Sequence, residues 1–381
     1  MAAIDRFEFL LREILEFFSN IRDVFAVLGA IYAAKKTLRL AATVFDSVNV
    51  HLISRLSANC DLSEKFGSWA VVTGSSEGIG RAYARELASR GFNLVLISKP
   101  ENRLYRAAKQ IGQAVIVGIC VLETAVVFGL NLTFTVVAST SNKEEFNVQT
   151  SCVAVDFSIG RDTYNLIWDS IKDKEIGVLV NNVGVMYDHP QYFLDVPVDR
   201  LWQIVNINVA AATMMTHMIL PQMVQRGKGA IVVVSSGACS QITPQMTVYA
   251  GTKSFLDYFA QALRYEYKNC GIVIQSLRPF YVNTKMTRYS KTLTSYGLLV
   301  PSAEVYARHA VATLGYSGRT TGYWPHSIQM WLSNMIPEWL WMWGASRLNT
   351  ALRRQALERL DRKDKMKSSD SMNTIAEAVQ S

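Results

Sequence analysis

The sequence predicts an α/β protein built on one doubly wound parallel sheet. Short apolar runs of strand length alternate with amphipathic stretches of helix length, and half of the 381 residues are hydrophobic, which is enough for a large core. Such alternation is typical of a parallel sheet covered by helices on both faces. We expect helices such as Arg81–Arg90 and Ser254–Lys268, and strands at Trp69–Thr73, Leu94–Ile97, Ser151–Val155, Val178–Val180, Ala230–Val234 and Ile272–Leu277.

The chain divides into four parts by composition. We expect a hydrophobic helical extension at 1–66, a single α/β domain at 67–325, an aromatic helical region at 326–360 and a polar, irregular tail at 361–381. An apolar stretch at 112–142 interrupts the domain and is long enough for a membrane span. However, one crossing would separate two strands of the same sheet. We therefore expect an insertion that packs as extra structure, or a segment added by a splice variant or a gene-model error.

The N-terminal extension does not resemble a cleaved signal. It lacks a basic start and a small-residue cleavage site. Its apolar run Val24–Ala34 is shorter than the roughly 20 residues of a spanning helix. Lys35 and Lys36 follow the run, which favours a helix lying on a membrane surface; the alternative is a helix packed on the α/β domain. The tryptophans of 326–360 leave a similar choice between a membrane interface, a wall of a lipid-like substrate cavity, and core packing.

The formal net charge of +8 raises the question of an anionic partner. No zinc finger, basic zipper or similar module is present, so we exclude nucleic acid. The five cysteines are scattered without a CxxC pair, and we predict no metal site. An anionic cofactor or an anionic membrane surface remains.

A glycine-rich turn follows the first predicted strand, in WAVVTGSSEGIGRAYARELASRG. Gly74, Gly78 and Gly80 permit a tight turn and let a pyrophosphate approach the backbone, while the N-terminus of the next helix attracts phosphate. The spacing is TGxxxGxG rather than GxGxxG, but a strand and a helix flank it. The turn, with Ser76 and Ile79, therefore predicts a Rossmann-type dinucleotide site.

The end of the second predicted strand indicates which dinucleotide binds. An acidic residue there would bind the ribose 2′-hydroxyl of NAD. The chain has Ser98 and Lys99 instead, a hydroxyl and a cation that suit a 2′-phosphate, and Arg81 adds charge nearby. We predict NADP(H) as the cofactor.

The segment SSGACSQITPQMTVYAGTK holds the predicted catalytic group. Tyr249 and Lys253 stand four residues apart, so on a helix they share one face. Tyrosine ordinarily titrates near 10, and a neighbouring cation is expected to lower that pKa toward the range useful for proton transfer. Ser236 at a strand end and Asn208 on an earlier helix complete the set. Together with the dinucleotide turn, these residues predict a nicotinamide-dependent carbonyl/alcohol oxidoreductase.

The motifs TGSSEGIG, NNVG, YAGTK and Pro279–Thr284 resemble the short-chain dehydrogenase/reductase family over about 69–311. The resemblance is strongest to its group of 17-beta-hydroxysteroid dehydrogenases of type 12 and very-long-chain 3-oxoacyl-CoA reductases. It implies that Tyr249 transfers the proton, that Lys253 lowers the pKa of Tyr249 and binds the nicotinamide ribose, and that Ser236 polarises the carbonyl. It implies further that Asn208 holds a relay water. For the cofactor it implies contacts from Asp156, Asn182, Gly184, Pro279 and Thr284.

The resemblance carries further expectations. The substrate would be a hydrophobic carbonyl compound, a steroid or a long-chain 3-oxoacyl-CoA, and the protein a homodimer in mitochondria or, alternatively, in the endoplasmic reticulum membrane. A second interpretation is a catalytically inactive binding or scaffold protein, which the subgroup and the insertion favour and the intact set of Tyr249, Lys253, Ser236 and Asn208 opposes. Relatives with Phe in place of the tyrosine are regarded as inactive, although this chain keeps Tyr249. The usual PG pair reads Pro279-Phe280, and the insertion lies within the cofactor-binding half.

Overall fold

The computed structural model describes residues 2–54, 62–99, 102–111, 113–119, 133–137, 145–287 and 297–380. Two compact units are present, Met1–Ile53 and Ser54–Ser381. The first is the long helix α1 (Ala2–Val48) followed by the π-helical turn η1 (Asn49–Ile53). Its apolar side chains, such as Phe25 and Leu28, are exposed. The extension predicted at 1–66 is therefore helical over its described first part, and its contact with a membrane remains a prediction.

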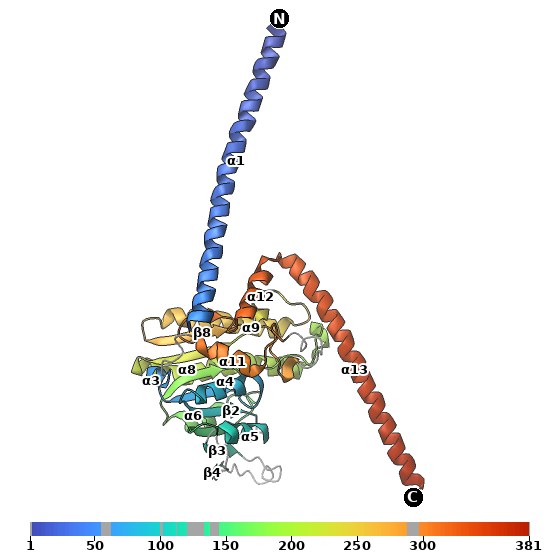
Figure 1. Cartoon of the computed structure of the whole chain (residues 1–381). Coiled ribbons are helices and arrows are strands. Elements are labelled where there is room, and N and C mark those ends of the chain that lie inside the picture. Colours follow the sequence, from blue (N-terminus) through green and yellow to red (C-terminus); the bar gives the residue numbers. More distant parts are fainter. Residues whose placement is uncertain are drawn as a thin grey trace. The chain divides into compact units, whose positions relative to one another are not determined.

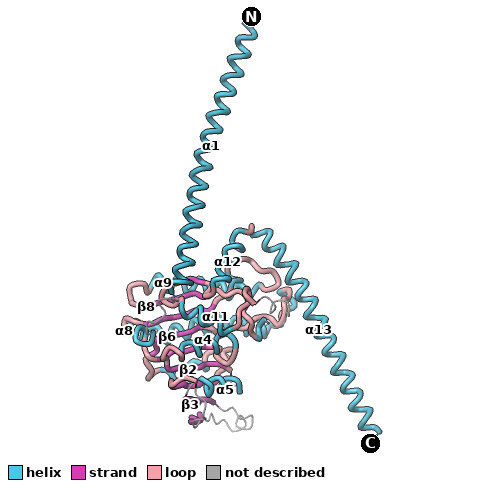
Figure 2. Tube along the Cα trace, viewed as in Figure 1, coloured by secondary structure: helices cyan, strands magenta, loops and turns pink. Residues whose placement is uncertain are grey.

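A single sheet forms the centre of the second unit (Figure 2). Its order is β4-β3-β5-β2-β1-β6-β7-β8-β9, and every neighbouring pair is parallel except β3 with β4. The six predicted strands are all present. The strands among the described residues are β1 Trp69–Thr73, β2 Asn93–Ser98, β3 Gln113–Ile119, β4 Thr133–Val137, β5 Gln149–Ala154, β6 Ile176–Asn181, β7 Gly229–Val234, β8 Ile272–Leu277 and β9 Arg319–Thr320.

Helices cover both faces of the sheet because the strands alternate their buried side chains. On β1, Ala70 and Val72 join one core cluster and Val71 joins the other. The first cluster includes Tyr83 and Tyr306 of α4 and α11; the second includes residues of α6, α8 and α9. The helices are α3 Leu62–Phe66, α4 Gly78–Ala88, α5 Asn102–Ile111, α6 Thr163–Ile171, α7 Val198–Val205, α8 Ala211–Arg226, α9 Thr247–Glu266, α11 Ala303–Ala312, α12 Trp324–Met335 and α13 Glu338–Gln380.

Among the described helices, the stretch Val198–Arg226 is long and apolar enough to cross a membrane, but half of its most apolar window is buried inside the protein. It comprises α7, the π-helical turn η4 (Asn206–Ala210) and α8, and α8 packs on β6. A core helix of a soluble domain passes the same test, so this stretch is weak support for a membrane span.

The insertion contributes two strands at one edge of the sheet (Figure 1). β3 pairs in parallel with β5, and β4 turns back antiparallel on β3. β5 keeps its place beside β2, with Ile97 opposite Val153 and Ser98 opposite Ala154. The two described strands of the insertion therefore lie outside the cofactor-binding strands and do not displace β5, which leads to Asp156.

The C-terminal region differs from the expected helix followed by an irregular tail at 361–381. Helix α13 continues to Gln380. The physical reason is composition: no proline or glycine follows Gly344, and Ala, Glu, Lys, Arg, Met and Gln, which favour helix, fill much of the stretch. Strand β9 was not expected from the sequence, because it has only two residues.

Candidate active site

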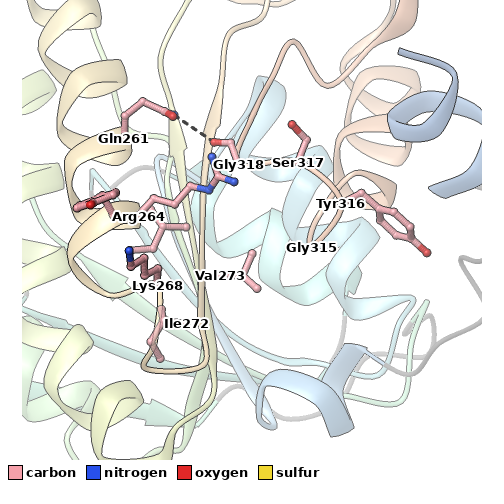
Figure 3. Close-up of a pocket in the computed structure, with 11 residues that line it drawn as sticks. Gln261, Arg264, Lys268, Ile272, Val273, Gly315, Tyr316, Ser317 and Gly318 are labelled. Carbon is pink, nitrogen blue, oxygen red and sulfur yellow. Dashed lines mark hydrogen bonds between the residues drawn. The ribbon is translucent and has the colours of Figure 1, made fainter. Parts of the chain in front are cut away.

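A cavity of about 840 Å³ follows the carboxyl ends of the strands, where β1 lies between β2 and β6. This is the crevice in which open α/β sheets bind ligands. Every predicted site residue lines it except Gly80 and Asn208. A second cavity, of about 580 Å³, lies between α9, β8 and Gly315–Gly318, shares no lining residue with the first, and contains none of the predicted site residues (Figure 3).

The glycine-rich turn is held tightly against β6. Gly74 and Gly78 have φ of +66° and +60°, a conformation that favours glycine. A Cβ on Gly74 would lie 2.9 Å from the Cα of Val183. The Asn182 amide Nδ2 donates hydrogen bonds to the carbonyl oxygens of Thr73 (2.9 Å) and Gly74 (3.1 Å). Asn182 thus lines the cavity and also fixes the turn.

Helix α4 begins at this turn with Glu77 as its N-cap, and the Glu77 side chain makes no capping hydrogen bond. Such a helix start suits a pyrophosphate. The Glu77 carboxylate has the wrong charge for that ligand, but it is paired with Arg103 at 2.6 Å and Lys285 at 3.7 Å. The size of the cavity, the glycine turn and this helix start fit a dinucleotide.

The predicted 2′-phosphate residues lie at the end of β2. The Ser98 hydroxyl donates to Ser76 Oγ at 3.1 Å, and Lys99 Nζ lies 2.9 Å from Asp156 Oδ2. The other carboxylate oxygen of Asp156 accepts bonds from the Ser158 backbone and hydroxyl. Burial raises the pKa of Asp156, but hydrogen bonds from Lys99 and Ser158 outweigh it, so the net pKa is lowered. Lys99 is thus paired with Asp156, a residue that the resemblance implies contacts the cofactor. Arg81, expected to add charge here, donates to Gln110.

Tyr249 and Lys253 share one face of α9, as predicted. Lys253 Nζ lies 5.9 Å from the centre of the Tyr249 ring and donates to the Val234 carbonyl at 3.0 Å. Ser236 follows β7 and is hydrogen-bonded to the Tyr249 phenol. A phenol, an ammonium and a hydroxyl therefore meet at one end of the cavity. This is the arrangement required to protonate or deprotonate an oxygen of a substrate.

The pKa of Tyr249 differs from the expectation. Burial raises it to about 12, and the hydrogen bond with Ser236 only partly opposes the rise. Burial also lowers the pKa of Lys253 to about 8. The net lowering of the Tyr249 pKa that the sequence predicted is therefore not found, because desolvation of the buried phenolate outweighs the interaction that opposes it.

Asn208 is fully buried within η4 and does not line the cavity. Its side chain accepts from the Val185 N–H (2.8 Å) and donates to the Val185 carbonyl (2.9 Å) and Thr252 Oγ1 (3.0 Å). A Cβ on Gly184 would lie 3.5 Å from Asn208 Oδ1 and 3.3 Å from Lys253 Nζ. Asn208 thus joins the segment after β6 to α9 and positions Lys253; its predicted relay water remains a prediction.

The far end of the cavity is an apolar wall that the sequence analysis placed only in general terms. The wall comes from the end of α12 and the start of α13, and it is held to the domain by bonds such as Asn349 Nδ2 to the Pro244 carbonyl at 2.7 Å. Its main residues are Ile336, Leu340, Trp341, Trp343 and Leu348. Pro279 and Thr284 line the cavity as well, beside the ring of Phe280.

His326 is a buried residue that sequence reasoning missed, since a lone histidine carries no spacing signal. Its Nδ1 accepts from the Phe280 N–H at 3.3 Å, and its Nε2 lies 3.2 Å from the Leu299 carbonyl. The ring is therefore neutral with the proton on Nε2, and it holds the segment after β8. Burial lowers the pKa of His326 to about 4.

We expect this histidine to make the protein less stable in acid. The unfolded chain binds a proton near pH 6.5 and the folded chain only near 4, so stability is complete above pH 6.5 and falls as the pH falls to 4. The loss from this group is on the order of 3 kcal/mol. Urea unfolding at several pH values should show a flatter profile for His326→Gln and an unchanged one for His217→Gln, which alters an exposed histidine of α8. Equal profiles for wild type and His326→Gln would contradict this.

Comparisons with known proteins agree with this geometry. The short chain dehydrogenase family model matches residues 68–128 and 125–293, with its two parts meeting at the insertion. The chain belongs to the short-chain dehydrogenase family. It is 46% identical over 357 residues to "Inactive hydroxysteroid dehydrogenase-like protein 1" of Pongo abelii, covering 94% of this chain and 99% of the relative.

The chain is also similar to a reductase by sequence and to a solved structure by fold. The chain is 36% identical to the very-long-chain 3-oxoacyl-CoA reductase of Rattus norvegicus, covering 87% of this chain and 94% of the relative. The structure of 3-ketoacyl-(acyl-carrier-protein) reductase from Brucella melitensis, complexed with NADH, superposes with a TM-score of 0.52 at 20% identity, over 67% of this chain and 95% of that one. The last shows the shared fold. The predicted family and fold class are thus confirmed.

Proposed function

We propose that this protein is an NADP(H)-dependent reductase of a hydrophobic ketone, a steroid or a long-chain 3-oxoacyl-CoA. The observation that carries the proposal is the meeting of Tyr249, Ser236 and Lys253 in a cavity with a glycine-rich helix start at one end and an apolar wall at the other. The identity to a very-long-chain 3-oxoacyl-CoA reductase supports this substrate class.

When bound, a nicotinamide cofactor would supply the hydride for the carbonyl carbon. Ser236 donates a hydrogen bond to the carbonyl oxygen and so stabilises the negative charge that develops there. Tyr249 gives its phenolic proton to the same oxygen, which completes the alcohol. Lys253 stabilises the resulting phenolate, and Asn208 positions Lys253 through its hydrogen bond to the adjacent Thr252. The apolar wall binds the hydrocarbon part of the substrate.

A second candidate is a binding protein without turnover. The name of the relative from Pongo abelii favours it, and so does the pKa of about 12 at Tyr249, since a phenol with a high pKa is a weak acid. An assay of purified protein with NADPH and a panel of ketosteroids and 3-oxoacyl-CoAs distinguishes the reductase from the binding protein. Loss of NADPH absorbance supports the reductase. NADPH binding, seen as enhanced fluorescence, without turnover of any compound supports the binding protein.

We expect Lys99→Ala to weaken NADPH binding about 10- to 100-fold, because one charge-assisted contact to a phosphate is worth about 1.5–3 kcal/mol. The change also leaves the Asp156 carboxylate without its cation, and that carboxylate repels a 2′-phosphate. NADH, which lacks this phosphate, should lose far less affinity. Fluorescence titration with both cofactors measures the difference, and Lys109→Ala on an exposed site of α5 is the matched control. An equal loss for NADPH and NADH would contradict a 2′-phosphate role for Lys99.

A further inference from the structure

The junction of α12 and α13 exposes large apolar side chains to solvent. We call residues 324–348, which include α12 and the first turns of α13, the elbow. Met335, Trp339 and Trp343 are 63%, 67% and 60% exposed, and Trp331 and Leu332 are exposed as well. Folded domains rarely leave a cluster of this size in water unless it binds something.

Exposed apolar residues from two other segments adjoin the elbow. Gln241 donates to the Ser333 carbonyl at 3.0 Å, which places its exposed neighbour Ile242 there. Gln329 donates to the carbonyl of the exposed Leu299 at 3.2 Å.

A third segment adjoins α13 just beyond the elbow. Arg353 pairs with Asp195 at 2.6 Å, and the preceding Leu194 is 92% exposed. The elbow is thus part of a wider apolar rim made by several separate stretches of chain.

The same elbow forms the wall of the cavity. Ile336, Leu340 and Trp343 line the cavity and are also exposed to solvent. The cavity therefore opens among these side chains of the elbow. A compound that enters here meets apolar surface before it reaches Tyr249.

Charge favours a bilayer as the partner of this surface. Between Trp324 and Gly344 the titratable side chains are His326, which is buried, and Glu338. Arginines follow along α13, and the Arg347 guanidinium lies 5.8 Å from the centre of the Trp343 ring. Tryptophans at the boundary of an apolar face, with cations just beyond them, match the interfacial region of a membrane that contains acidic lipids.

We propose that the elbow docks on an acidic phospholipid bilayer, so that the cavity opens toward the acyl chains. Together with the proposed function, which supplies the substrate class, this gives a route by which an apolar ketone passes from the bilayer to Tyr249 without crossing water. The docking itself needs neither cofactor nor turnover.

The test uses the full chain and vesicles of phosphatidylcholine and phosphatidylglycerol with brominated acyl chains. Bromine quenches tryptophan only at the depth of the chains, and α1 contains no tryptophan, so quenching reports on the remainder of the protein. We expect quenching in the wild type. Trp331→Phe with Trp339→Phe should remove much of the quenched fluorescence. Trp168→Phe on α6, where the side chain is 45% exposed, should remove none of it.

A charged pair of substitutions gives a second measurement. Trp331→Glu with Trp339→Glu should abolish quenching of the remaining elbow tryptophans, even where the N-terminal helix still holds the chain on vesicles. Absent quenching in the wild type, or quenching unchanged in either double variant, would overturn the proposal. One further outcome would also overturn the proposal: the wild type is a dimer in solution, the charged variant is a monomer, and bromolipids do not quench the wild type. The elbow would then be an interface between two copies of the chain. Since no readout depends on NADPH, failure of the reductase assay and failure of docking remain distinguishable.

Discussion

Tyr249→Phe should reduce turnover by about 10²- to 10⁴-fold, the usual contribution of a positioned general acid. The change removes one oxygen and leaves the ring in place beside Lys253. The carbonyl oxygen would then have no phenolic proton to take as the hydride arrives.

The assay follows NADPH absorbance with whichever ketone the wild type reduces. NADPH affinity, measured by fluorescence, should stay within a few-fold of the wild type, since the lost group acts on the substrate. Tyr258→Phe is the matched control, because Tyr258 lies on the same helix α9 and is 78% exposed. Turnover that persists in Tyr249→Phe would assign the proton to another group. A loss of NADPH binding would assign a structural role to the hydroxyl.

The sequence predicts the central sheet well because its information there is local. Each of the six expected strands is an apolar run that is buried on both faces, and the alternation with helices fixes their parallel direction. The strands at the edges of the sheet are less predictable, because their places depend on pairing with other strands. β9 has two residues and is defined by pairing with β8, and the side on which β3 joins β5 depends on a partner distant in the chain.

The candidate site likewise combines features with a local sequence signal and features that depend on residues distant in the chain. The four-residue spacing of Tyr249 and Lys253 and the glycine turn are local signals, and the structure places these residues as expected. The pairing of Lys99 with Asp156 joins residues far apart in the chain, and the raised pKa of Tyr249 depends on burial. Neither property is encoded in a short segment, so neither could be predicted from spacing.

Gly80→Ala should destroy dinucleotide binding and destabilise the fold. Gly80 lies on α4, and an added Cβ would be 2.3 Å from both the Gly74 carbonyl oxygen and Asn182 Nδ2. The clash involves backbone on one side and the amide that fixes the turn on the other, so the turn itself must move. Overpacking of this kind costs about 1–3 kcal/mol. A displaced turn no longer lets a pyrophosphate approach the start of the helix.

The matched control is Gly251→Ala, the same substitution in helix α9 between Tyr249 and Lys253. A Cβ there meets no atom within 4 Å, so alanine should stabilise the helix by about 0.5–1 kcal/mol. Urea unfolding should show a lower stability for Gly80→Ala and a higher stability for Gly251→Ala. NADPH titration should show lost binding for Gly80→Ala only. Equal NADPH affinity of Gly80→Ala and Gly251→Ala would contradict this prediction. The close approach of α4 to the glycine-rich turn would then not form the cofactor site, and this end of the cavity could not be assigned to the pyrophosphate.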